Sequence, residues 1–126
     1  MKRILAAALF VAGTSTAWAA DPVEGTWESP TNDDGASIQV QIAPCGGSFC
    51  GTITNVKGGD QSIKGERMLW DMAAKGGGTY SGGKVWAPDD DKTYRGKLEL
   101  SGNSLKISGC VLGGAVCRGE TFARVN

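Results

Sequence analysis

TYRGKLELSGNSLKI, residues 93–107, alternates apolar and polar side chains on both sides of a short turn. Before the turn, Tyr94, Leu98 and Leu100 fall on one face, and after it Leu105 and Ile107 repeat the pattern. A period of two residues is typical of a β-strand with one buried and one solvated face. The intervening Ser-Gly-Asn tripeptide favours a tight reversal of the chain. This stretch therefore predicts two antiparallel strands joined in a hairpin.

The same pattern recurs along most of the chain. Residues 37–42 alternate cleanly, with Ile38, Val40 and Ile42 on one face. We expect residues 57–66 to form a loop or a single helical turn, and no segment shows a long helical period. About eight short strands in one small domain predict an all-β fold, a sandwich or a barrel. The remaining strands are expected near residues 24–29, 50–56, 67–73, 79–87 and 119–125.

The first nineteen residues carry the layout of a secretory signal peptide. A short basic start precedes an apolar run at residues 4–12, and the Ala-Trp-Ala tripeptide ending at residue 19 suits signal peptidase. The apolar run is shorter than the roughly 20 residues that span a bilayer. We therefore expect cleavage before Ala20, a single mature domain over residues 20–126, and a periplasmic or secreted protein that is not embedded in a membrane.

Four cysteines, an even number, predict disulfides in an exported chain. Of the three arrangements that four cysteines allow, Cys45 with Cys50 and Cys110 with Cys117 is favoured. Each of these pairs brackets a Gly-Gly turn that brings its two ends together. A zinc site or a redox pair is the alternative, although zinc sites usually carry C-x-x-C or histidine ligands, which these spacings lack.

Charge and composition exclude several classes of function. Removal of Lys2 and Arg3 with the signal peptide leaves 11 basic and 13 acidic residues, a net charge of −2. The sequence contains no run of basic residues, so we expect no nucleic-acid partner. It contains no histidine, which removes Ser-His-Asp and Cys-His catalysis and histidine-ligated zinc. We therefore expect no enzyme activity and no cofactor.

The longest run of carboxylates is Asp89-Asp90-Asp91, which follows Pro88. This combination is typical of a turn. A calcium site is the alternative, because calcium prefers several carboxylate oxygens, but the spacing of a calcium-binding loop is missing. We therefore expect no resident metal.

The aromatic residues in the middle of the chain suggest a binding site. Met68, Trp70 and Met72 fall on one face of their strand, and Tyr80, Gly82, Lys84 and Trp86 fall on one face of the next. If these faces point inward, Gly82, Gly96 and Gly109 leave room among them. Either the interior is a plain packed core, or it holds a cavity. In the second case we expect the ligand-binding residues to be Met68, Trp70, Trp86 and Tyr94.

The two ends of the mature chain resemble those of lipocalin and calycin barrels. Gly25-Thr26-Trp27 stands at the first strand, and Arg124 stands near the end of the last. The resemblance implies an eight-stranded up-and-down barrel, with Trp27 closing one end and Arg124 packing across its ring. A cation over an indole face contributes about 0.5–2 kcal/mol. The two residues are thus expected to have a structural role.

Three longer segments, in order, resemble the bacterial exported family catalogued as domain of unknown function 2147. They are residues 42–53, 80–94 and 107–118. The resemblance implies a lipocalin-like barrel in the periplasm or the medium, and it implies no activity. We expect a protein that binds a small apolar or amphipathic ligand. The alternative is a protein-interaction module, an inhibitor or an envelope partner, with a packed core.

Overall fold

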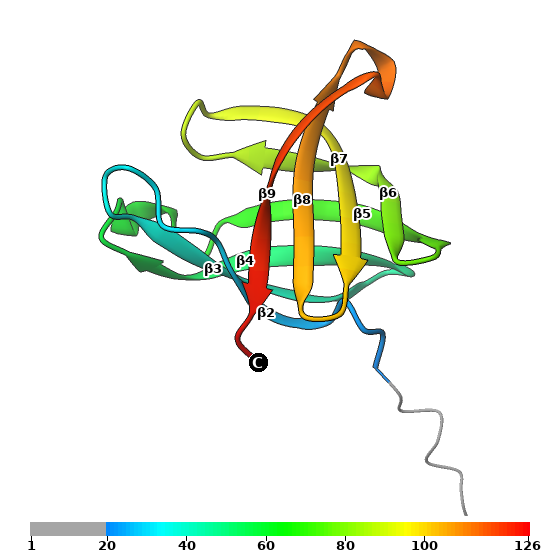
Figure 1. The fold of residues 1–126 in the computed structure, drawn as a ribbon, viewed down its shortest axis with the longest axis horizontal. Helices are drawn as coiled ribbons and strands as arrows, with labels where there is room; N and C mark the ends of the chain where they lie inside the picture. Colours follow the sequence, from blue (N-terminus) through cyan, green and yellow to red (C-terminus); the bar gives the residue numbers. More distant parts are fainter. Residues whose placement is uncertain (1–19) are drawn as a thin grey trace, which may run out of the picture.

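The computed structural model describes residues 20–126, so the predicted signal peptide at residues 1–19 lies outside the described residues. The strands follow one another in a single closed barrel, each antiparallel to the next, and β9 returns to pair with β2 (Figure 1). The predicted all-β, up-and-down barrel of eight strands is confirmed. The strands are β2 (Gly25–Glu28), β3 (Ser37–Cys45), β4 (Ser48–Lys57), β5 (Arg67–Gly76), β6 (Thr79–Ala87), β7 (Lys92–Ser101), β8 (Ser104–Val111) and β9 (Val116–Arg124).

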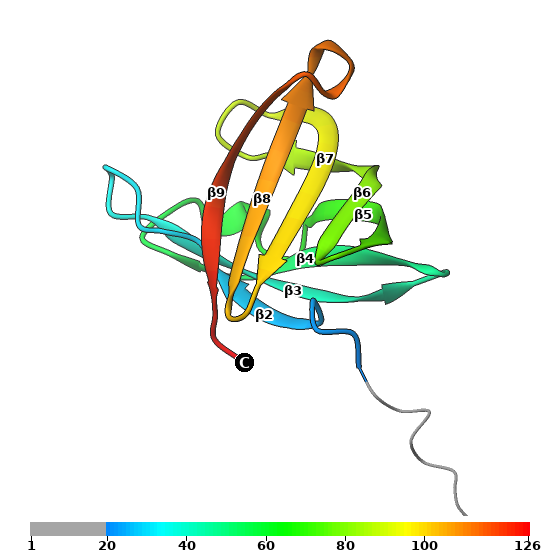
Figure 2. The same cartoon turned by 45° about the vertical axis from the view of Figure 1, so that its right-hand side comes forward.

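Two single turns of 3-10 helix connect strands. The first, η2 (Gln61–Ile63), lies between β4 and β5, where the sequence predicted a loop or one helical turn. The second, η3 (Leu112–Gly114), forms the tip of the β8–β9 connection, which extends beyond the neighbouring turns in Figure 2. No helix within residues 20–126 is long and apolar enough to cross a membrane.

The interior of the barrel is a continuous apolar core to which every strand contributes. Tyr94, Leu100 and Ile38 pack against this core and are partly buried, in agreement with the alternation in the sequence. Burial of one large apolar side chain stabilises the fold by roughly 1.5–3 kcal/mol. One buried residue from each strand, in chain order, is Trp27, Val40, Ile53, Leu69, Val85, Leu98, Leu105 and Phe122.

A β-bulge in β5 changes which of its side chains face inward. Leu69 pairs with Gly51 and Met72 pairs with Phe49, so β5 carries one more residue than β4 between these pairs. Asp71 takes up the extra length with φ 58°. Because an added residue reverses the alternation, Leu69 and Met72 are both buried and Trp70 is only half-buried. The predicted inward face of Met68, Trp70 and Met72 is therefore wrong for Trp70.

A matching irregularity in β6 has the same effect. The register between β6 and β7 shifts between Ser81 and Lys84, across two consecutive glycines. Tyr80 and Val85 are buried, whereas Gly82 and Lys84 are exposed and Trp86 is half-buried. The prediction that Tyr80, Gly82, Lys84 and Trp86 share an inward face is wrong because the bulge inserts one residue.

The expected glycine gaps in the interior are filled. A Cβ on Gly96 would overlap the terminal methyl group of Met72, and a Cβ on Gly109 would lie 3.0 Å from Cβ of Tyr94. Gly82 has open space beside it, but it lies on the surface. The prediction that these three glycines leave interior space is therefore wrong.

The barrel closes along a short seam between β2 and β9. Trp27 pairs with Arg124 and Glu28 pairs with Ala123, and backbone hydrogen bonds also join Thr26 to the two residues after Arg124. The indole N–H of Trp27 donates to the carbonyl oxygen of Val23 at 2.9 Å. The guanidinium of Arg124 lies 4.3 Å from the centre of the Trp27 ring, the arrangement that the lipocalin resemblance implies.

The predicted disulfide arrangement is confirmed. Cys45 is bonded to Cys50 across the β3–β4 turn, and Cys110 is bonded to Cys117 across the β8–β9 connection. No cysteine among residues 20–126 is left as a free thiol. The two bonds fix the ends of two hairpins.

Candidate ligand-binding cleft

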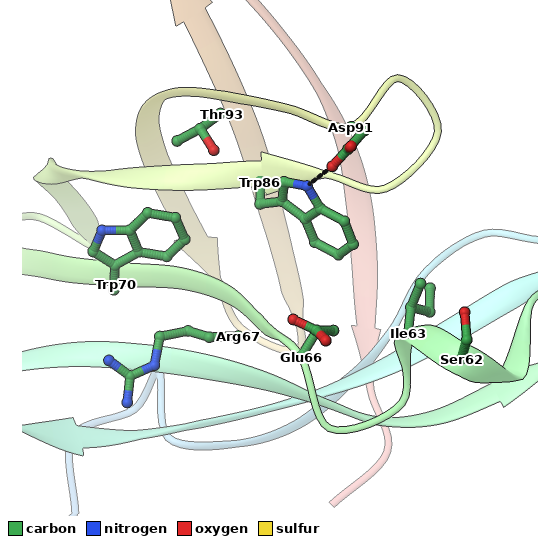
Figure 3. Close-up of a pocket in the computed structure, with 8 residues that line it drawn as sticks. All are labelled: Ser62, Ile63, Glu66, Arg67, Trp70, Trp86, Asp91 and Thr93. Carbon is green, nitrogen blue, oxygen red and sulfur yellow. Dashed lines mark hydrogen bonds between the residues drawn. The ribbon is translucent and has the colours of Figure 1, made fainter.

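An open cleft of about 400 Å³ lies between the β4–β5 connection and the ends of β6 and β7 that meet at the Asp89–Asp91 turn. Figure 3 shows the indoles of Trp70 and Trp86 along the same stretch of this cleft, with Glu66 and Arg67 below them. Its lining combines two aromatic rings, one aliphatic side chain and five polar ones. The lining residues are Ser62, Ile63, Glu66, Arg67, Trp70, Trp86, Asp91 and Thr93.

Trp86 is held in place from both sides. Its ring packs against the apolar core, and its N–H donates to Oδ1 of Asp91 at 2.8 Å. Asp91 adopts φ 53° in the turn after β6, a left-handed conformation that Asp tolerates better than most residues. The turn thus orients the indole, which is half-buried and lines the cleft.

Trp70 reaches the cleft because of the bulge in β5. It stands between the buried Leu69 and the exposed Asp71, and it is half-buried without belonging to the core cluster. Its backbone pairs with that of Lys84 on β6. A half-exposed indole offers a large flat apolar surface together with one polar N–H.

The η2 segment borders the cleft opposite the strands, and hydrogen bonds hold it in place. Asp60 accepts hydrogen bonds from the amide and the hydroxyl of Ser62, and these bonds hold the pKa of the Asp60 carboxyl below its usual value. The side-chain amide of Gln61 donates to the carbonyl oxygen of Val56 at 2.8 Å. Ile63 packs against the core. The cleft is therefore bordered by fixed backbone on the η2 side as well as on the strand side.

Comparisons with known proteins agree with this architecture. The family described as "Uncharacterized protein conserved in bacteria (DUF2147)" matches residues 25–124, from the first strand of the barrel to Arg124. The chain belongs to this family. None of the curated proteins matches it. The family description assigns no activity.

The barrel of this DUF2147 protein is similar to a solved lipocalin. That structure is protein HP1028 from the human pathogen Helicobacter pylori, which is described as belonging to the lipocalin family. The TM-score is 0.67 at 18% sequence identity, over 82% of this chain and 83% of that one. At this identity the similarity establishes the fold alone, and the fold of this family member is lipocalin-like.

The structure brings together two of the four residues predicted to bind a ligand in this DUF2147 protein. Trp70 and Trp86 line one cleft, on the half-exposed side of their strands rather than inside the barrel. Met68 is buried in the core. Tyr94 packs its ring beside Gly109, and its hydroxyl donates to Asp90 at 2.6 Å, which raises the pKa of the phenol. Met68 and Tyr94 do not line this cleft.

Sequence reasoning missed the residues that complete the cleft. Ile63, Glu66 and Arg67 come from residues 57–66 and the start of β5, where the sequence gives the weakest pattern. Asp91 belongs to the acidic turn, and its proximity to Trp86 was the one available signal. Asp90 and Asp91 accept hydrogen bonds from Tyr94 and Trp86, which agrees with the interpretation of this run as a turn.

Proposed function

We propose that this member of the DUF2147 family is an exported protein that binds a small amphipathic ligand in the cleft between Trp70 and Trp86. One observation carries the proposal. Two half-buried indoles, supplied by different strands, line a single cleft of about 400 Å³. A volume of roughly 300–1,000 Å³ is typical of sites for small molecules.

The chemistry of the lining indicates the class of ligand. Trp70, Trp86 and Ile63 supply apolar surface, which favours the flat or aliphatic part of a ligand. Ser62, Thr93 and the charged side chains around them supply hydrogen bonds at the rim. A molecule with one apolar face and a polar edge would satisfy both parts of the site.

The proposal is one of binding and not of catalysis. The chain has no histidine, and the cysteines of residues 20–126 are held in disulfides. A nucleophile with an adjacent base is therefore hard to assemble from this chain. Ligand capture needs neither group.

Export is the second part of the proposal. The signal-like residues 1–19 and the two disulfides support it, because disulfides persist mainly in oxidising compartments. Mass spectrometry of the protein recovered from the periplasm or the medium tests it. The expected mass corresponds to a chain that begins at Ala20 and carries two disulfides. Full-length protein retained in the cytoplasm would contradict this part alone.

Tryptophan fluorescence tests the cleft directly. The mature chain would be titrated with a fatty acid, a retinoid and a flavonoid, and the emission compared among wild type, Trp70→Phe and Trp86→Phe. We expect quenching or a blue shift in wild type, and a response reduced in each variant. Lys106→Gln is the control, because Lys106 is exposed on β8 outside the cleft lining and its substitution should leave binding unchanged.

A role as a protein-interaction module is the alternative, and the packed interior of the barrel favours it. Met72 and the Tyr94 side chain occupy the space beside Gly96 and Gly109. Absence of any fluorescence response across the ligand panel would remove the binding proposal and leave this alternative. Circular dichroism of each variant must first match wild type, so that a lost response reports the cleft and not the fold.

A further inference from the structure

A second cavity lies over the β6 bulge. It is an open groove of about 510 Å³ bordered by β6, β7 and the disulfide of the β8–β9 connection. Four cationic side chains line it: Lys75, Lys84, Arg95 and Lys97. None of the residues that line the Trp70–Trp86 cleft lines this groove. We propose that this groove binds a phosphoryl group, carried by a soluble phosphate compound or by a lipid headgroup.

The first observation is a pair of like charges placed directly opposite each other. Lys84 on β6 and Arg95 on β7 are register partners, and both are exposed. Facing residues of an antiparallel pair have Cβ atoms about 4.5–5.5 Å apart, and like charges at such positions destabilise the sheet. An anion bound between them would convert this repulsion into attraction.

The second observation is the lack of compensating acid. No carboxylate lines the groove among residues 20–126. Within the same residues, Lys75, Lys84 and Arg95 make no ion pair. Lys97 lies 3.8 Å from Glu99, and both side chains are nearly half exposed, so this contact is weak. The positive charge of the groove is therefore left for a ligand.

The third observation is the bare floor of the groove. Gly82 adopts φ 90° and has no atom within 4 Å of the position where a Cβ would stand. Gly83 packs against the backbone of Trp70 and Asp71, so it leaves no side chain above the floor. Glycine in the middle of a strand often marks a place where a ligand approaches the backbone closely.

The wall beyond Arg95 is fixed by the Cys110–Cys117 bond. Both cysteines and Gly114 line the groove, and Arg95 lies alongside Gly114. An arginine held against such a wall presents a planar fork that suits two phosphoryl oxygens, while lysines act as point charges. The combination of Arg95 with Lys84 and Lys97 matches a group that carries up to two negative charges.

The four cations are dispersed along the sequence and come together only in the fold, because they belong to three different strands, β5, β6 and β7. Their convergence is notable because the chain from Ala20 onward has a net charge of −2. The attraction for an anion is therefore local to the groove and is not a property of the whole surface. This proposal does not depend on the Trp70–Trp86 cleft.

Calorimetric titration of the mature chain with inorganic pyrophosphate at low ionic strength tests the groove. We expect binding to wild type that weakens as salt is added. The double substitution Lys84→Gln, Arg95→Gln should weaken pyrophosphate binding at least about tenfold. Loss of a single hydrogen bond to a charged group already weakens binding by roughly that factor. Lys92→Gln with Lys106→Gln is the matched control. It removes the same charge from exposed positions outside the groove lining and should bind as wild type does.

Flotation with vesicles separates the two sources of the phosphoryl group. Vesicles of phosphatidylglycerol would be compared with vesicles of phosphatidylcholine. Binding to the anionic vesicles that is lost in the Lys84→Gln, Arg95→Gln variant assigns a lipid headgroup. Binding to pyrophosphate without flotation assigns a soluble phosphate compound. The proposal would be overturned if wild type bound neither pyrophosphate nor the anionic vesicles. It would also be overturned if the control variant lost as much binding as the Lys84→Gln, Arg95→Gln variant.

Discussion

The guanidinium of Arg124 lies 4.3 Å from the centre of the Trp27 ring, across the seam at which β2 and β9 close the barrel. It also donates to the carbonyl oxygens of Glu24 and Pro22, and to the side-chain oxygen of Asn103. One side chain thus ties the segment before the first strand to the last strand and to the β7–β8 turn. These contacts add to the two ladder pairs of the seam and to the backbone hydrogen bonds that join Thr26 to Val125 and Asn126.

Arg124→Ala should destabilise the protein by about 2 kcal/mol, because it removes the cation–π contact and leaves carbonyl oxygens without donors. Urea unfolding followed by tryptophan emission measures the change. Arg118→Ala is the control, because Arg118 is exposed on the same strand and should change stability by less than about 0.5 kcal/mol. Equal effects of the two substitutions would contradict the structural role of Arg124.

Gly83→Ala should cost about 2 kcal/mol or more and disturb the cleft. The new Cβ would overlap the carbonyl oxygen of Trp70 and approach the carbonyl carbon of Asp71 to 2.6 Å, so backbone must move. We expect a lower unfolding midpoint and a changed emission spectrum of Trp70. Gly59→Ala should stay within about 1 kcal/mol of wild type, because its nearest neighbours are side-chain methyl groups at 3.3 Å.

The two tyrosines should both ionise at higher pH in the folded protein than in the unfolded chain. Burial raises the pKa of Tyr80, and its hydrogen bond to Asp21 adds to the effect. The hydrogen bond to Asp90 raises the pKa of Tyr94. Because both folded pKa values are raised, the stabilisation is present below about pH 10 and is lost as pH rises above it.

Phenolate absorbance near 295 nm follows this titration in native protein and in protein unfolded by urea. Asp90→Asn should return one of the two phenols toward its ordinary pKa and leave Tyr80 unchanged. A native titration curve that coincides with the unfolded one would contradict the hydrogen bonds of both tyrosines.

Removal of the Cys110–Cys117 bond by a double substitution to serine should lower stability by roughly 2–2.5 kcal/mol, the chain-entropy value for so short a loop. The Cys45 and Cys50 double variant should lose a similar amount, since its loop is of similar length. Chemical denaturation measures both. A much larger loss for one pair would show that its bond also maintains native packing.

The sequence predicted the barrel because most strands obey simple alternation. Residues 93–107 form β7 and β8 with their apolar side chains turned toward the core, as the pattern indicates. The two Gly-Gly turns predicted the disulfide pairing, which depends only on local chain reversal. Strand alternation and these disulfides depend only on residues that are close in the sequence, so the sequence alone is enough to predict them.

The site was predicted less well because it depends on partners that are distant along the chain. Asp71 and the glycines at 82–83 insert residues into β5 and β6, and alternation gives no sign of a bulge before the pairing of strands is known. Trp70 was therefore assigned to the wrong face. The glycine at 96 suggested a gap, but only the fold reveals that Met72 fills it.

Each sulfur bridge lies within one hairpin and joins cysteines that are consecutive in the sequence. Because the chain is synthesised from its N-terminus, Cys45 and Cys50 are both present before either of the later thiols. The native linkages need no contact between distant parts of the chain, so oxidation does not have to wait for the barrel to close. The reduced chain should accordingly recover its two native bonds on oxidation without a step that rearranges mispaired cysteines.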